Sequence, residues 1–219
     1  MTTVLVCDDE PQILRALRVV LREAGFEVVL AETAQEALDR ASTRPPDAAI
    51  LDLVLPDGTG VDVCRELRRW SEMPILVLSA VGDEEAKVEA LEAGADDYVT
   101  KPFGARELVA RLQAALRRVP GDPGQARVEA GELVVDVAAR RITRSGEEVH
   151  LTPIEYDLLL ELVRHRGRLL THRTLLTEVW GPGYADDVPV LRTHLANLRR
   201  KIGAHHIRTD PGVGYRFAD

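Results

Sequence analysis

Ala48-Ala49-Ile50-Leu51-Asp52 is a short apolar run that ends in a single carboxylate, and this pattern recurs in the first half of the chain. Similar runs at residues 4–7, 75–78 and 98–100 are followed by polar side chains, namely Asp8 and Asp9, Ser79, and Lys101. Continuous apolar runs of this length are typical of strands that are buried on both faces of a parallel sheet. The carboxyl ends of such strands share one edge, where open α/β sheets bind ligands. We therefore expect these five polar residues to meet there.

The segments between these runs have helical periodicity. Pro11 suits a first helical turn and Thr33 suits an N-cap, whereas Gly25 and Gly94 mark helix ends. Helical spacing of apolar residues continues through 13–21, 37–41, 61–68, 88–91 and 108–116, and a further strand is expected near residues 28–31. Five strand–helix units in alternation predict an α/β domain with a doubly wound, five-stranded, mostly parallel sheet.

A linker is predicted where the alternation stops. Residues 120–125 contain two prolines and two glycines and interrupt every periodicity. We therefore assign residues 1–119 to a first domain, 120–126 to a linker and 127–219 to a second domain.

The second domain begins with strand-like segments and continues with helical ones. Residues 133–136, 140–143 and 147–150 predict a small antiparallel sheet. Thr152-Pro153-Ile154-Glu155 is a capping box that starts a helix. A second helix is expected to start at Thr171, and a third helix is expected to continue up to Ile202. Residues 207–217 read as a β-hairpin. Three helices followed by a hairpin indicate a winged helix-turn-helix.

Charge is distributed unevenly between the two domains. Residues 1–119 carry 22 acidic and 14 basic side chains, whereas the rest of the chain carries 14 of each. Residues 188–208 contain five basic side chains and no acidic one. This segment combines basic side chains with a helix, a combination that can reach DNA phosphates and base edges.

Other features favour a cytoplasmic protein without a membrane anchor. No apolar stretch approaches the ~20 residues of a membrane span, and the chain enters a strand pattern without a basic and apolar leader. Cys7 and Cys64 form no metal-binding or CxxC pattern and lie on apolar faces, so we expect buried thiols.

The acidic edge has the chemistry of a magnesium and phosphoryl site. Asp8, Asp9 and Asp52 would repel one another at close range, and oxygen-only ligands suit Mg²⁺. Asp52 ends the most apolar run and is the best candidate for a carboxylate nucleophile. Lys101 can supply an ammonium, and Ser79 a hydrogen bond, to phosphate oxygens. The alternative is that these residues only cap helices and solubilise loops, but their position at the ends of four predicted strands favours a site.

Several motifs of the chain resemble those of response regulators of the OmpR/PhoB subfamily. In the first domain these motifs are 6–10, 50–58, 78–80, 94–98 and 101–103, and in the second they are 151–156 and 212–217. Shorter strings at 69–71, 149–153 and 178–182 are most similar to regulators of potassium-transport operons. The resemblance implies a flavodoxin-like (CheY-like) receiver domain joined to a winged-helix DNA-binding domain.

The resemblance also implies roles for individual residues. Asp52 would accept a phosphoryl group from a sensor histidine kinase, and Lys101 would contact it. Mg²⁺ would be held by Asp8, Asp9, Asp52 and the backbone carbonyl of Val54. Ser79 and Tyr98 would form the switch pair that responds to phosphorylation, although Tyr98 on its own reads as a half-buried strand aromatic.

Two surfaces are implied as well. A symmetric receiver dimer would form on phosphorylation, and the residues implied for it are Lys87, Val88, Leu91, Asp96, Asp97, Glu107, Ala110, Arg111 and Arg118. The pairs would be Lys87–Glu107, Asp97–Arg111 and Asp96–Arg118; without the resemblance these residues read as a solvated mixed-charge surface. Promoter DNA would be contacted by Arg192, Thr193, His194, Asn197, Arg199, Arg200, Arg208 and Arg216. The loop at 180–187 matches a region that contacts RNA polymerase in some relatives.

The favoured interpretation is thus a phosphorylation-controlled transcription regulator that is not an enzyme. Two alternatives stay open at this point. One is a Mg²⁺-dependent phosphatase or phosphotransferase that acts on small molecules, which would turn over substrate without binding DNA. The other keeps the fold but makes DNA binding independent of phosphorylation.

Overall fold

The chain forms two compact units, Met1–Arg117 and Arg118–Asp219, in a computed structural model. The structure describes residues 1–80, 82, 84–116, 127–137 and 139–218. The linker predicted at 120–126 lies outside the described residues. Among those described, no helix is both long and apolar enough to cross a membrane.

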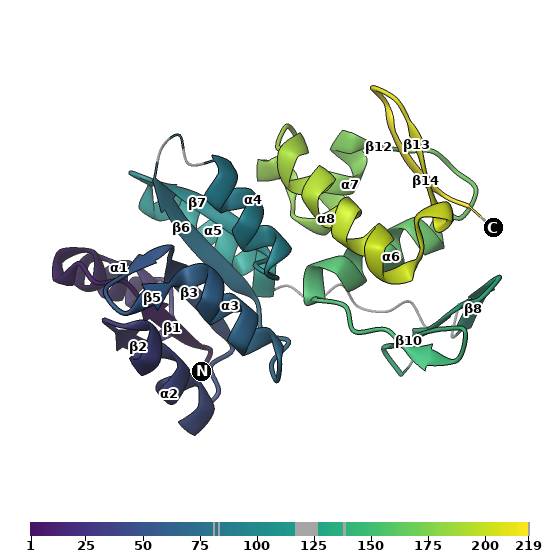
Figure 1. Cartoon of the computed structure of the whole chain (residues 1–219). Helices are drawn as coiled ribbons and strands as arrows, with labels where there is room; N and C mark the ends of the chain where they lie inside the picture. Colours follow the sequence, from purple (N-terminus) through teal and green to yellow (C-terminus); the bar gives the residue numbers. More distant parts are fainter. Residues whose placement is uncertain (81, 83, 117–126, 138, 219) are drawn as a thin grey trace. The chain divides into compact units, whose positions relative to one another are not determined.

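A five-stranded parallel sheet organises the first unit, in the order β2-β1-β3-β6-β7 (Figure 1). The strands are β1 (Thr3–Cys7), β2 (Glu27–Ala31), β3 (Ala48–Asp52), β6 (Ile75–Ala80) and β7 (Asp97–Lys101). Strands β1 and β3 are buried along their whole length, as their apolar runs predict. The register pairs Asp52 with Leu78, and Ser79 with Thr100, so the polar strand ends lie along one edge.

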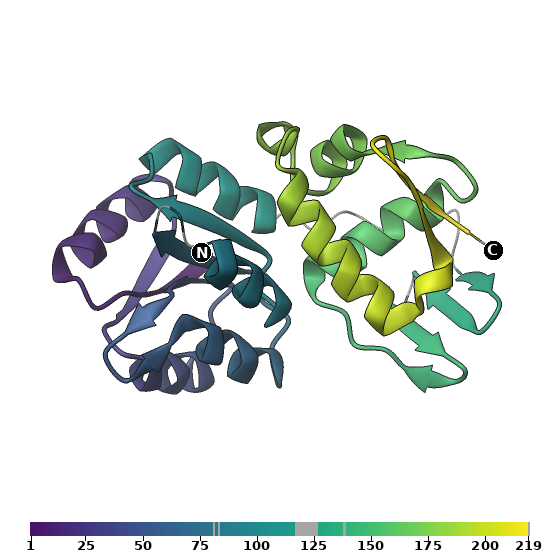
Figure 2. The same cartoon turned by 45° about the horizontal axis from the view of Figure 1, so that its top comes forward.

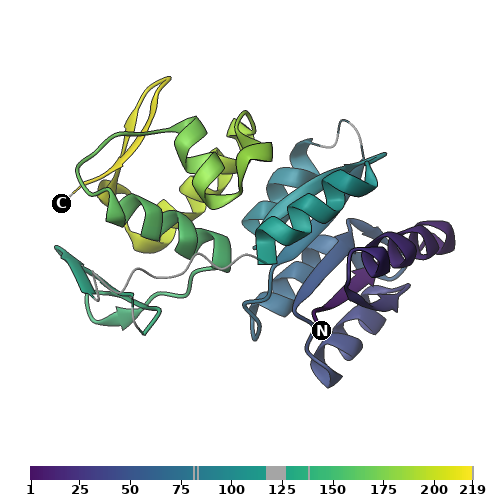
Figure 3. The same cartoon turned by 180° about the vertical axis from the view of Figure 1, so that it is seen from behind.

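Five helices cover the two faces of this sheet. They are α1 (Pro11–Glu23), α2 (Ala34–Thr43), α3 (Gly60–Arg68), α4 (Glu84–Glu92) and α5 (Ala105–Leu116). Helices α1 and α5 lie on one face, which is turned to the viewer in Figure 3, and α2, α3 and α4 lie on the other. Leu14, Leu17, Leu108 and Leu112 pack against the sheet in a continuous core. The short hairpin of β4 (Val54–Leu55) and β5 (Gly58–Thr59) connects β3 to α3.

Both cysteines are buried free thiols, as expected. Burial raises the pKa of the Cys7 thiol, and that of the Cys64 thiol, to about 12. Neither thiol is therefore ionised near neutral pH.

The second unit begins with a four-stranded antiparallel sheet. Its strands are β8 (Arg127–Ala130), β9 (Leu133–Asp136), β10 (Arg141–Arg144) and β11 (Glu147–Glu148), in the order β11-β10-β9-β8. The sequence did not indicate β8, which packs through a single buried residue, Ala130. The last expected strand is also shorter than predicted: β11 ends at Glu148, although Val149 N still donates to Ile142 O of β10 at 2.8 Å.

Three helices and a hairpin complete this unit as a winged helix-turn-helix (Figure 2). The helices are α6 (Pro153–Arg164), α7 (His172–Val179) and α8 (Val188–Ile202), with short 3₁₀ turns η1 (Pro182–Tyr184) and η2 (Ala204–His206). The hairpin of β13 (Ile207–Asp210) and β14 (Gly214–Phe217) pairs with β12 (Leu170–Thr171). Thr152 and Glu155 form the predicted capping box at the start of α6. The predicted fold class is confirmed in both units.

Candidate functional site

The carboxyl edge of the parallel sheet brings three carboxylates together. Asp8 and Asp9 follow β1 directly and Asp52 ends β3, and one oxygen from each lies within 4.8 Å of the others. Asp8 is fully buried and Asp52 is 9% exposed, whereas Asp9 is exposed. The neighbouring pairing of β1 and β3 thus places carboxylates side by side, as the two apolar runs predicted.

Lys101, at the end of β7, supplies the cation of this edge. Its Nζ lies 2.8 Å from Asp8 Oδ2, 3.0 Å from Asp52 Oδ1 and 3.9 Å from Glu10 Oε1. Burial alone would lower the pKa of Lys101, but hydrogen bonds to Asp8 and Asp52 outweigh that effect and raise it. Lys101 therefore stays charged and bridges two of the three carboxylates.

The surroundings of Asp52 oppose its ionisation. Burial raises its pKa, and the charge of Asp8 adds to this effect, while Lys101 opposes both. One ammonium among three carboxylates leaves an excess of negative charge. Such a site favours a small divalent cation with oxygen ligands.

Ser79 provides the second indication of a ligand. Its residue is 1% exposed, and among the described residues nothing accepts from or donates to its Oγ. A buried hydroxyl without a partner is costly unless a ligand completes it. Because Ser79 lies at the end of β6 beside the Asp52 strand, a phosphoryl oxygen on Asp52 is a partner of suitable chemistry.

The other residues expected at this site have different settings. Tyr98 is half-buried on β7, and the Lys87 ammonium lies 4.9 Å from the centre of its ring. Val54 begins β4, two residues beyond Asp52, and its side chain is 73% exposed. Because the Val54 side chain points to solvent, this residue would take part in the site through its backbone carbonyl and not through its side chain.

Gly60 is a site residue that the sequence reasoning missed. Its amide donates to Leu53 O at 3.0 Å, and a Cβ added to Gly60 would lie 2.1 Å from Asp52 O. Helix α3 can therefore start against the end of β3 only because residue 60 has no side chain. This close approach arises from the chain path between two elements, and no local sequence signal reveals it.

The residues expected to pair two receivers are largely engaged within one chain. Asp96 is 2% exposed and accepts from Arg68 Nη2 and from Ile75 N, both at 2.7 Å. Asp97 is also buried and accepts from Arg111 Nη1 at 3.1 and 3.2 Å. The expected pair of Asp96 with Arg118 is thus disfavoured by the burial of Asp96, and Arg118 lies outside the described residues.

The remaining residues of this face vary in exposure. Lys87 is 6% exposed and donates to Glu84 Oε1 at 2.8 Å, and Leu91 is buried. Val88, Glu107 and Ala110 are exposed. These three offer the accessible part of the expected dimer face.

Helix α8 and the hairpin carry the residues that were expected to contact DNA. Two of these residues, His194 and Asn197, are only 1% and 2% exposed, so their burial disfavours the expected contact. His194 packs against Trp180 at 5.5 Å between ring centres. The buried face of α8 therefore includes His194 and Asn197 as well as its apolar residues.

Three of the expected arginines have protein partners, and one of them, Arg200, stays exposed while its Nη2 donates to Asn197 Oδ1 at 2.9 Å. Arg199 donates to Ile207 O at 2.7 and 3.1 Å and to Thr209 Oγ1 at 2.7 Å, and Arg216 pairs with Asp210 at 2.7 Å. Arg192, Arg200 and Arg208 are exposed, and Thr193 is half-buried. The accessible basic residues thus come from both α8 and the first strand of the hairpin.

Comparison with known proteins agrees with this architecture. The family model described as response regulator receiver domain matches residues 4–113, and the one described as transcriptional regulatory protein, C terminal, matches residues 146–217. KdpE of Mycobacterium tuberculosis is 51% identical over 99% of both chains. KdpE of Escherichia coli is 48% identical over 99% of both chains, and MtrA of Mycolicibacterium smegmatis is 40% identical over 97% of this chain and 95% of its own.

Solved structures of related chains align with this chain over its length. A RitR mutant aligns over 99% of both chains with a TM-score of 0.78 and 28% sequence identity. DrrB of Thermotoga maritima, an OmpR/PhoB homologue, aligns over the full length of both chains with a TM-score of 0.54 and 29% identity. The chain therefore belongs to the OmpR/PhoB-type two-component response regulators, in which a receiver domain is followed by a DNA-binding domain that regulates transcription.

Proposed function

We propose that this regulator is controlled by phosphorylation of Asp52 by a sensor histidine kinase. The observation that carries the proposal is the meeting of Asp52, Lys101 and the unpartnered Ser79 hydroxyl at one sheet edge. A carboxylate that held its phosphoryl group would act as an input and not as a catalyst that turns over substrate.

The residues of the edge divide the chemistry among them. Mg²⁺ would be held by Asp8, Asp9, Asp52 and the carbonyl of Val54, and it would neutralise charge on the incoming phosphoryl group. An Asp52 oxygen attacks the phosphorus, and the bond from phosphorus to the kinase histidine breaks. Lys101, already 3.0 Å from Asp52, compensates the charge of the aspartyl phosphate. Ser79 moves toward the phosphoryl group and donates its hydroxyl hydrogen to a phosphoryl oxygen. The ring of Tyr98 turns inward in response.

The output would be promoter binding by a dimer in the cytoplasm. Val88, Glu107 and Ala110 would contribute to the receiver contact, and Arg192, Arg200 and Arg208 would contact DNA. The loop at 180–187 would contact RNA polymerase. The target genes would include a potassium-transport operon, because the Escherichia coli relative is called the KDP operon transcriptional regulatory protein.

Phosphorylation is tested with acetyl phosphate and Mg²⁺, followed by mass spectrometry of intact protein and peptides. We expect one phosphoryl group per chain on the peptide containing Asp52 and none in Asp52→Asn. Asp39→Asn is the matched control, because Asp39 is an exposed carboxylate on α2 and should not affect labelling. Full labelling of Asp52→Asn at another residue would show that the phosphoacceptor is wrongly assigned.

DNA binding is tested by footprinting upstream of a potassium-transport operon, with and without acetyl phosphate. We expect protection at lower protein concentration after phosphorylation, and no such gain for Asp52→Asn. Equal protection in both states would support the alternative in which DNA binding is independent of phosphorylation.

A further inference from the structure

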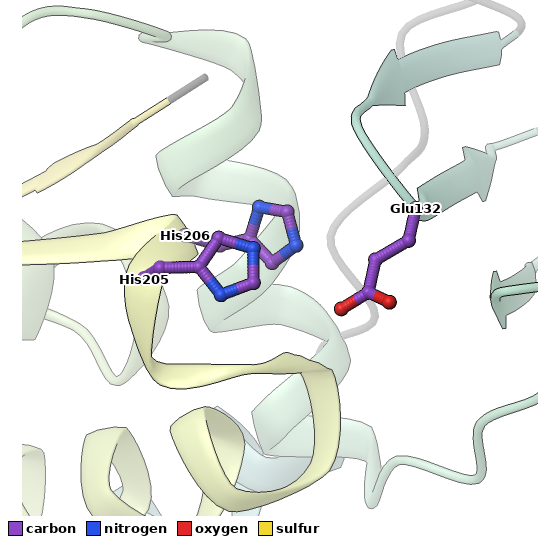
Figure 4. A group of neighbouring side chains, drawn as sticks. All are labelled: Glu132, His205 and His206. Atoms are coloured by element: carbon purple, nitrogen blue, oxygen red, sulfur yellow. The ribbon is translucent and has the colours of Figure 1, made fainter.

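A second group of metal-binding side chains lies in the DNA-binding unit, far along the sequence from the acidic edge. Glu132 lies in the turn between β8 and β9, and His205 and His206 lie in η2 between α8 and β13. One ligand atom from each residue lies within 4.8 Å of the others. Figure 4 shows the Glu132 carboxylate extending from its turn toward the two imidazole rings.

His206 is the residue that points to a ligand. It is 1% exposed, and among the described residues neither ring nitrogen has a hydrogen-bond partner. Its ring stacks on Phe217 with 5.9 Å between ring centres, which accounts for the burial of the ring but not for its unsatisfied nitrogens. Burying an imidazole nitrogen without a hydrogen-bond partner costs free energy. An unprotonated imidazole nitrogen can instead bind a metal ion through its lone pair.

The carboxylate of the group is held in place by two neighbours. Arg144 Nε donates to Glu132 Oε1 and Ser145 Oγ donates to Oε2, both at 2.7 Å. Hydrogen bonds of this kind orient metal-bound carboxylates in known sites.

We propose that Glu132, His205 and His206 bind a divalent transition-metal ion of the Zn²⁺ class. Two imidazoles and one carboxylate are a common ligand set for such an ion, with water in the fourth position. Ligands about 2.0–2.1 Å from a tetrahedral ion are about 3.3 Å apart, so ligand atoms at the 4.8 Å limit would have to move closer by up to about 1.5 Å. His205 is exposed and packs its ring against Gly203, which has no side chain to hinder it, so its ring can make most of that movement.

The ion would join two parts of the DNA-binding unit that are far apart in the chain. Glu132 belongs to the antiparallel sheet, whereas His205 and His206 directly follow α8 and precede the first strand of the hairpin. Binding would therefore fix the end of α8 against the β8–β9 turn. Metal concentration would then affect the stability of the surface that contacts DNA.

The test is an optical titration with Co²⁺, which absorbs strongly in the visible range when it is bound tetrahedrally through imidazole nitrogen. The full-length chain carries Asp8→Asn and Asp9→Asn, so that the receiver carboxylates do not compete. We expect one Co²⁺ per chain with a strong visible band that Zn²⁺ displaces. Adding His205→Ala or Glu132→Gln should weaken binding at least tenfold, and His206 should shift in the histidine ring NMR spectrum on Zn²⁺ addition.

His150→Ala is the matched control, because His150 is an exposed histidine of the same unit and not a member of the group. It should bind Co²⁺ as the parent chain does. Far-UV circular dichroism should be unchanged in His205→Ala, since His205 is exposed. The proposal is overturned if the parent chain gives no strong band, or if the band and the dissociation constant are the same in His205→Ala.

Discussion

At the scale of single residues, the acidic edge carries more negative than positive charge, because one ammonium lies among three carboxylates. Lys101 bridges Asp8 and Asp52, yet burial still raises the pKa of Asp52. Folding therefore disfavours the ionised Asp52 when no divalent cation is bound. The stability that this group contributes is present below its ordinary pKa and is lost as the pH rises through the raised value.

Asp52→Asn should consequently stabilise the metal-free protein. In EDTA near neutral pH we expect the free energy of unfolding to rise by about 1 kcal/mol, with the gain disappearing in acid, where Asp52 is protonated. Urea denaturation at several pH values measures this. Mg²⁺ at about 100 times its dissociation constant should add about 2.7 kcal/mol to the wild type and much less to the variant. An Asp52→Asn protein that is less stable in EDTA at neutral pH would contradict the interpretation.

Single residues also show where sequence reasoning succeeded. The positions of Asp8, Asp52, Ser79 and Lys101 follow from apolar runs and strand polarity, and the structure places them at one edge. The burial of His194 could not be predicted from the sequence. His194 packs against Trp180, and the periodicity of α8 carries no information on the path of the segment that contains Trp180. Local patterns therefore predict which strand end bears a side chain, but not what a neighbouring loop covers.

At the scale of elements, the geometry of the acidic edge depends on how closely α3 approaches β3. Gly60 starts α3 directly against the Asp52 carbonyl, and Thr59 caps the helix by accepting from Asp62 N. The short β4–β5 hairpin thus connects β3 to α3 within a compact region around Asp52. Sequence periodicity predicted both elements, whereas their contact distance could not be predicted from it.

Gly60→Ala should disturb this turn. A Cβ 2.1 Å from a backbone oxygen forces the helix away from β3, so we expect a loss of about 1–3 kcal/mol of stability and slower labelling of Asp52 by acetyl phosphate. Thermal unfolding and labelling rates measure the two effects. Gly58→Ala is the control, because its Cβ would meet only Ala34 Cβ at an ordinary 3.7 Å. Equal behaviour of the two variants would show that the approach is not a constraint.

At the scale of the whole molecule, the two units differ in charge: the receiver is acidic, whereas the second unit carries a basic surface on α8 and the hairpin. The accessible basic residues number fewer than the sequence suggested, since Arg199 and Arg216 have partners within the unit. With few phosphate contacts per chain, two copies on adjacent half-sites are expected for firm binding. The sequence predicted two domains, but it could not distinguish basic residues that are exposed from those that form bonds within the helix and hairpin.

Arg192→Ala should reduce affinity for promoter DNA and its dependence on salt. Each phosphate contact contributes about −0.9 to the slope of log K against log salt concentration, so the slope per chain should become less steep by about that amount. Fluorescence anisotropy at several salt concentrations measures the slope. Arg15→Ala removes the same charge from an exposed position on α1 of the receiver and should leave the slope unchanged. An unchanged slope for Arg192→Ala would remove this residue from the DNA-binding surface.

The engagement of Arg199 has a consequence for how such regulators diversify. Its guanidinium donates to the carbonyl of Ile207 and the hydroxyl of Thr209 and so links the helix to the first strand of the hairpin. Exposed positions of α8, such as Arg192 and Ala196, take no part in that joint. Substitutions there can therefore change which operator is recognised while the frame that presents the helix stays the same, and promoter preference can evolve separately from stability.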